Sequence, residues 1–189
     1  MIKKKDTRLY NILLPIWMLV FFPTWLWLIQ IPANYLIDRI VLKWSLGGAE
    51  GPEGVMMDKA ERGAFCRRNT WKICLAGFLS DFVGAIIMFG VFFISVLIGD
   101  DSPASPLFDK LEAGVGFNPF SHFPSLLVVL LAIALAGLCI YLLDKLILRK
   151  AGLTAEQAKK SALRLAVITA PYLFLFPTQL LFDSGLYGM

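Results

Sequence analysis

The chain has 189 residues, of which 58% are hydrophobic and 13% aromatic, and its formal net charge is +4. Because a soluble domain is only about 45–50% apolar, a mean hydropathy of +0.70 excludes an ordinary soluble protein. No polar stretch is long enough for a second domain, so we expect residues 1–189 to form a single membrane domain.

Four long apolar runs mark the predicted membrane segments. A helix needs about 20 apolar residues to cross roughly 30 Å of hydrocarbon, and all four runs reach that length. The predicted fold is therefore an all-α, polytopic integral membrane helical bundle. The first run is also longer than the roughly 7–15 residues of a signal-peptide core, so we expect it to remain part of the protein. The four segments cover about residues 9–37, 73–98, 123–143 and 163–182.

The first segment is broken by three prolines, Pro15, Pro23 and Pro32. Each proline lacks a backbone N–H and clashes with the carbonyl four residues earlier. One interpretation is a re-entrant hairpin that bends near residues 22–24 and keeps the N-terminus cytoplasmic. The other is a kinked crossing with the N-terminus outside. Both flanks are basic, which favours the hairpin, and the hairpin requires other helices or a second subunit to cover its broken backbone.

A Phe-Pro-Thr triplet occurs twice, at residues 22–24 and 176–178. We expect Pro177 to free the carbonyl of Leu173, and Pro23 to act likewise, with the adjacent threonine able to compensate. The first triplet falls where the predicted hairpin turns back. The second is expected only to kink a full membrane span.

Two polar helices are expected at the cytoplasmic surface, at about residues 33–46 and 55–68. The first is amphipathic and carries Trp44, a residue type that favours the depth of lipid headgroups. The glycine-rich stretch 47–54 predicts a turn between them. The second helix leads into the next membrane segment.

Charged residues predict the topology. Lys and Arg concentrate in residues 1–8, 38–72 and 144–164, whereas residues 99–122 hold four acids and a single lysine. Since cytoplasmic loops carry the Lys and Arg excess, we expect a plasma (inner) membrane protein with its C-terminus outside and its N-terminus cytoplasmic. The basic face suits anionic lipids rather than nucleic acid.

Asp81 is the most informative polar residue, because it lies inside the second apolar run. An acid at mid-membrane costs at least about 2.5–3.5 kcal/mol. Small residues recur every four positions beside it, a pattern that lets helices approach closely. Asp81 is therefore expected to face other helices, either as a cation or proton site or as a hydrogen-bonding group that fixes the packing. These small residues, with one on the third segment, are Ala76, Gly77, Gly84, Ala85 and Gly137.

Asp144 and Arg164 are candidate partners of Asp81 on the third and fourth segments. An Asp–Arg pair would link two or three helices. The alternatives are a hydrated charge at a helix end for Asp144 and a snorkelling side chain for Arg164. The full predicted polar pathway comprises Asp81, Asp144, Arg164, Ser80, Thr24, Thr178 and Gln179.

The sequence offers little support for an enzymatic function. The only histidine is His122, no pair of histidines or cysteines has metal-ligand spacing, and no cofactor motif is present, so we expect no catalytic residue, cofactor or metal. The favoured function is a small transporter or channel for a cation, proton or small solute. The alternative is a non-enzymatic accessory, assembly or regulatory subunit of another membrane protein. Because four segments enclose little space, we expect a homo-oligomer.

Overall fold

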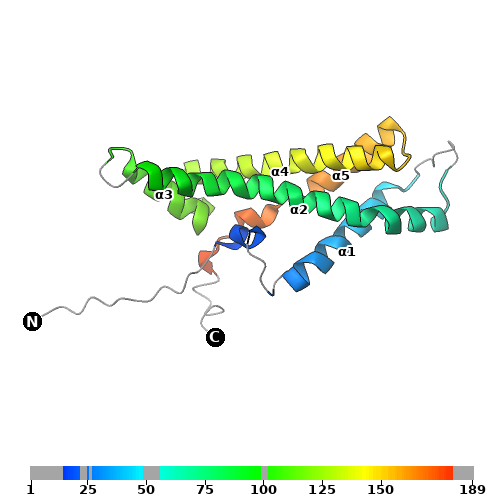
Figure 1. Ribbon diagram of the computed structural model, residues 1–189, viewed down its shortest axis with the longest axis horizontal. Helices are drawn as coiled ribbons and strands as arrows, with labels where there is room; N and C mark the ends of the chain where they lie inside the picture. The colour runs from blue at the N-terminus through cyan, green and yellow to red at the C-terminus, as the bar shows by residue number, and fades with distance from the viewer. Residues whose placement is uncertain (1–14, 22–24, 26, 49–55, 99–101, 181–189) are drawn as a thin grey trace, which may run out of the picture.

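The computed structural model describes residues 15–21, 25, 27–48, 56–98 and 102–180. These residues are predominantly helical, which confirms the all-α prediction. Figure 1 shows an elongated bundle in which two long helices, α2 and α4, run side by side. In chain order the elements are η1 (Ile16–Val20), α1 (Trp27–Ser45), α2 (Lys59–Ile98), α3 (Ser105–Gly116), η2 (Pro119–Ser121), α4 (Phe123–Lys150), α5 (Ala155–Thr169) and η3 (Tyr172–Leu175), where η denotes a 3₁₀ helix.

Helices α2 and α4 are long and apolar enough to cross a membrane, and within the described ranges they alone meet that standard. Only 17% of the most apolar stretch of α2 and 28% of that of α4 is buried inside the protein. The core helix of a soluble protein would be mostly buried, whereas these helices present apolar side chains outward. The predicted segments 73–98 and 123–143 are thus confirmed as helices able to span a bilayer.

The last predicted segment, residues 163–182, is not a continuous span. Helix α5 ends at Thr169, and Ala170 leaves the helical region with φ −55° and ψ 151°. The next residue is Pro171, whose ring disfavours the α conformation in the residue before it. The expectation of a full span kinked at Pro177 is therefore wrong. The carbonyl of Leu173 is not freed either, because it accepts the Phe176 N–H at 3.0 Å.

The first predicted segment is also divided, into η1 and α1. Pro32 lies inside α1, so the expectation of an interfacial helix that starts after this proline is wrong. The predicted bend near residues 22–24 lies outside the described residues.

The second polar helix, expected at about residues 55–68 as a separate element, is the first part of α2. At 1.5 Å per residue the 40-residue α2 is about 60 Å long, twice the thickness of the hydrocarbon layer. A reciprocal capping box starts it: Glu61 N–H donates to Asp58 Oδ1 at 2.7 Å, and Asp58 N–H donates to Glu61 Oε2 at 2.9 Å.

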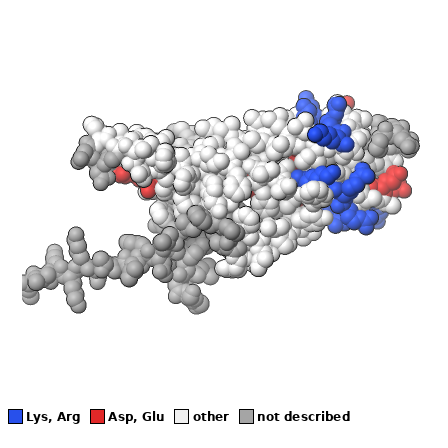
Figure 2. Space-filling model, in the orientation of Figure 1, with Lys and Arg blue, Asp and Glu red and all other residues white. Residues whose placement is uncertain are grey.

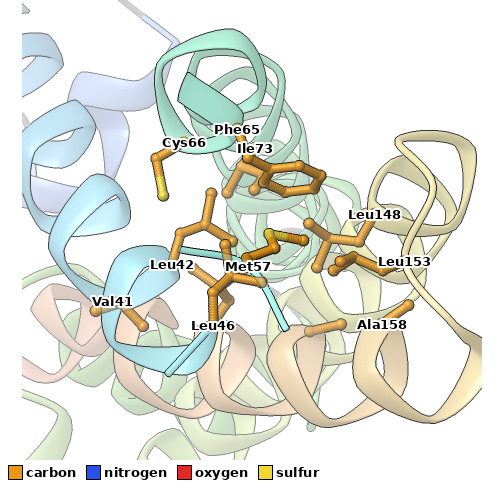
Figure 3. Packing of buried hydrophobic residues seen from close by; sticks show 12 residues of the cluster. Val41, Leu42, Leu46, Met57, Phe65, Cys66, Ile73, Leu148, Leu153 and Ala158 are labelled. Carbon is orange, nitrogen blue, oxygen red and sulfur yellow. The ribbon is translucent and has the colours of Figure 1, made fainter. Parts of the chain in front are cut away.

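Two hydrophobic clusters hold the bundle together. The first lies where α1, α2, α4 and α5 meet, near the connections between them (Figure 3), and includes Leu42, Ile73 and Leu148. The second joins η1 and η3 to α2, α3 and α4, and includes Trp17 and Phe174. Along α2, the polar stretch around Asp81 falls between these clusters.

Charges are segregated along the molecule. On the face shown in Figure 2, Lys and Arg gather at the end that holds the α1–α2 and α4–α5 connections. Acidic side chains appear near α3 at the opposite end, where Asp109 and Glu112 lie, and the surface between the ends is uncharged. This arrangement matches the surface expected of a protein with an apolar membrane band.

Gly84 allows α2, α4 and η3 to approach closely. A Cβ atom at this position would lie 2.8 Å from Phe174 Cε2 and 3.0 Å from the Ala132 carbonyl oxygen. We expect Gly84→Val to lower the free energy of unfolding by about 1–3 kcal/mol through overpacking. Thermal unfolding in detergent measures this change. The matched control is Gly90→Val on the same helix, where a Cβ would meet nothing within 4 Å; equal destabilisation by both variants would contradict the close-packing role of Gly84.

Candidate functional site

A cavity of about 540 Å³ lies between α1, α2, η1 and the segment where α5 ends and η3 begins. Most of its lining is apolar, which suits a site that excludes bulk water. A small set of polar side chains from three helices faces it. These are Gln30, Asn34 and Asp38 on α1, Asp81 on α2 and Thr169 on α5.

Asp38 is the central acid of this site. It is only 6% exposed, and Gln30 and Asn34 precede it at intervals of four residues, so all three share one face of α1. Burial raises the pKa of Asp38 to about 7, although a hydrogen bond with Cys74 opposes the shift. Asp38 is not among the predicted site residues, because residues 33–46 were expected to form a helix at the cytoplasmic surface. The polar stripe on an otherwise apolar helix was the available signal.

Asp81 lines the same cavity from α2. Its Oδ1 atom is buried and has no hydrogen-bond partner among the described residues. Gly77 lies one turn before it, also on the cavity wall, and a Cβ at Gly77 would meet nothing within 4 Å. Gly77 was predicted to serve helix packing, but its surroundings show that it instead leaves space in the cavity.

Asp144 on α4 is completely buried, and neither of its carboxylate oxygens has a hydrogen-bond partner within the described part of the chain. The alternative of a hydrated helix-end charge is therefore wrong. Asp144 does not line the cavity, yet the charge of Asp38 acts on both Asp144 and Asp81.

Arg164 does not meet the prediction of an Asp–Arg pair. Its guanidinium donates to the Ser45 carbonyl at 3.3 Å and lies 4.7 Å above the centre of the Trp44 ring. No ion pair between Arg164 and Asp81 or Asp144 occurs among the described residues. The reason is geometric: α5 packs its basic side chain against the C-terminal end of α1, away from the acids.

Most of the remaining predicted residues form hydrogen bonds within their own helix or take part in helix packing. Ser80 is fully buried and donates to the Ala76 carbonyl at 2.8 Å, which satisfies its hydroxyl within its own helix. Ala76 and Ala85 are buried, and a Cβ at Gly137 would lie 3.8 Å from the Ala170 side chain. Thr24 lies outside the residues that the structure describes.

Thr178 and Gln179 tie the end of the described chain to distant elements. The Ile16 N–H donates to Thr178 Oγ1 at 3.2 Å, and the Gln179 N–H donates to the Phe117 carbonyl at 3.1 Å. The η1 segment therefore packs against the end of the described chain, and η1 lies beside η3 in Figure 1. Residues of η1 and of η3 both line the cavity.

No known protein family, curated protein or solved structure matches the chain. Within the described residues, no group of three or more His, Cys, Asp or Glu side chains is arranged to hold a metal ion.

Proposed function

We propose that the protein is a small multi-pass membrane transporter or channel for a proton, a cation or a small cationic solute, and that the cavity is its binding site. The observation that carries this proposal is the pair of acids, Asp38 and Asp81, that two different helices place in one cavity of about 540 Å³. A buried carboxylate is costly unless it is paired. Two acids that line one cavity are therefore better explained by a bound proton or cation than by a purely structural role.

The acids favour a positive occupant. A carboxylate in an apolar surrounding is stabilised when it takes up a proton or binds a cation. Gln30 and Asn34 add amide oxygens to the same wall. An anion would meet repulsion from both acids.

The broken end of α5 adds to this preference. Thr169 and Ala170, where the helix ends, line the cavity. The last carbonyls of a helix have no intrahelical donor and lie at the negative end of its dipole. Interrupted helices that direct such ends at a midplane site are a recurrent feature of transporters.

The proposed topology follows from the charges. Helices α2 and α4 cross the plasma (inner) membrane, the basic end lies in the cytoplasm, and α3 lies outside. We further propose a homo-oligomer, in which a second copy covers part of the outward apolar surface of α2 and α4.

A second candidate function is an accessory or regulatory subunit of another membrane protein. It is favoured by an apolar hollow of about 780 Å³ on α1 and α2, lined by residues such as Pro32, Trp71 and Phe82. A partner helix would fill such a hollow. Copurification of one membrane protein in mild detergent, with no flux from the isolated chain, would favour this candidate.

Filling the cavity tests the transport proposal. We expect Gly77→Leu to reduce flux in proteoliposomes at least tenfold, because its side chain would occupy the open space beside Asp81. Protons are followed with a trapped pH-sensitive dye, and monovalent cations with radiolabelled tracers. Gly90→Leu is the matched control, since Gly90 also has open space around it but does not line the cavity.

The proposal fails if wild-type proteoliposomes move none of these probes faster than protein-free liposomes. It also fails if Gly77→Leu and Gly90→Leu conduct alike.

A further inference from the structure

A second hollow, independent of the cavity, lies at the basic end of the molecule. It measures about 360 Å³ and is formed by Ile40, Lys43 and Trp44 on α1 and by Lys59 and Arg62 at the start of α2. Of the five described residues that line it, three are cationic and two are apolar. The hollow does not share a residue with the acidic cavity, so its role does not depend on the proposed transport function.

The cations of this hollow are not neutralised by carboxylates in the described part of the chain. Beside Lys59 and Arg62, the carboxylates of Asp58 and Glu61 accept each other's backbone N–H groups in the capping box. Arg62 uses its Nε to donate to the Asp58 carbonyl at 3.3 Å, which orients the guanidinium but leaves its charge uncompensated.

The tryptophan on the apolar side of the hollow contacts a neighbouring cation. The side chains of Trp44 and Ile40 are 60% and 59% exposed. The Arg164 guanidinium lies over the Trp44 ring at 4.7 Å and also donates to the Ser45 carbonyl. A cation stacked on one side of the indole and hydrogen-bonded to α1 limits the freedom of the ring before any ligand binds.

The position of the hollow indicates its ligand. It is formed by the C-terminal part of α1 and the first turn of α2, where cationic side chains stand beside an exposed tryptophan, and Trp is typical of the depth of lipid headgroups. A free anion would use the cations but not the exposed tryptophan and isoleucine. An anionic phospholipid uses both, since its phosphate meets cations while its glycerol and acyl carbons contact apolar side chains.

We propose that this hollow binds the headgroup of an anionic phospholipid from the cytoplasmic leaflet. Lys43, Lys59 and Arg62 contact the phosphate, and Ile40 and Trp44 contact the first carbons of the lipid. The lipid fastens the C-terminal end of α1 to the beginning of α2.

The test measures binding of fluorescently labelled phosphatidylglycerol to the purified full-length protein in detergent micelles. A cation near the membrane surface contributes about fivefold in affinity, so we expect Lys43→Gln/Arg62→Gln to bind about 30-fold more weakly than wild type. The matched control is Lys159→Gln/Lys160→Gln, which removes two exposed cations of α5 outside the hollow. Equal thermal unfolding of the three proteins without lipid verifies that each is folded.

Two competition experiments identify the ligand. We expect unlabelled phosphatidylglycerol to displace the probe, whereas phosphatidylcholine and inorganic phosphate do not. Displacement by inorganic phosphate at similar concentration would overturn the proposal in favour of a simple anion site. An equal loss of affinity in both double variants would overturn it too, because the attraction would then arise from the basic surface as a whole.

Discussion

Asp81→Asn is expected to reduce cation or proton flux through the reconstituted protein at least tenfold, to near the rate of protein-free liposomes. Asparagine has almost the same shape as aspartate, so the packing of α2 is retained, but an amide can neither release a proton nor balance the charge of a cation. The buried Oδ1 atom, which has no hydrogen-bond partner among the described residues, would be replaced by a neutral group. Initial rates under an imposed gradient measure the effect.

A carboxylate-to-amide change elsewhere provides the control. Asp109 on α3 is exposed and does not line the cavity, so Asp109→Asn should leave the flux at the wild-type rate. If Asp81→Asn conducts as well as Asp109→Asn, Asp81 is not part of the conduction site and its role is in helix packing.

Asp38→Asn is expected to make the protein more stable than wild type above pH 7 and to weaken the dependence of its stability on pH. Burial raises the pKa of Asp38 to about 7, above its value of about 3.9 in the unfolded chain. The folded state therefore retains a proton that the unfolded state loses. The stabilisation is fully present below about pH 4 and is lost as the pH rises through about 7.

The size of this effect follows from the shift. About three pKa units correspond to an upper limit on the order of 4 kcal/mol, because the unfolded chain gains that free energy by ionising Asp38 while the folded protein cannot do so cheaply. Asparagine does not ionise, so the variant lacks this contribution. Thermal unfolding in detergent between pH 5 and pH 8 should show a wild-type stability that falls more steeply than that of the variant.

The groups around Asp38 are Cys74 and Asp81 on α2 and Asp144 on α4, so a part of the slope is expected to remain. Asp109→Asn again serves as the control and should keep the wild-type slope. Identical slopes for Asp38→Asn and wild type would show that Asp38 is hydrated in the folded protein.

The sequence was sufficient to predict the two long helices and to single out Asp81 as a candidate functional residue. An apolar run of membrane-spanning length is a local property, and it identified residues 73–98 and 123–143, which lie within α2 and α4. The stripe of small residues placed Gly84 at a close approach of helices, as its contacts with α4 and η3 show. Asp81 stood out because an acid is rare inside such a run.

Hydropathy failed where the backbone is interrupted. Residues 163–182 are apolar enough for a span, but Pro171 ends α5, and the chain continues as η3. The repeated Phe-Pro-Thr triplets drew attention to two interrupted segments, although the triplet at 176–178 does not mark the break itself. That η1 and η3 contact each other could not be read from either segment alone, because more than 150 residues separate Ile16 from Thr178.

The sequence by itself determined that this protein is helical and that its charges separate into a basic and an acidic end. It predicted four membrane segments, of which the structure supports 73–98 and 123–143 as helices able to cross a membrane. Only the tertiary structure decided which polar residues meet. Aspartate is a residue type usually found at the surface. Asp38 is buried because α1 lies against α2 and α5. Arg164 contacts Trp44 instead of an acid for the same reason. Burial is a property of how helices cross, and a local pattern of residues does not contain that information.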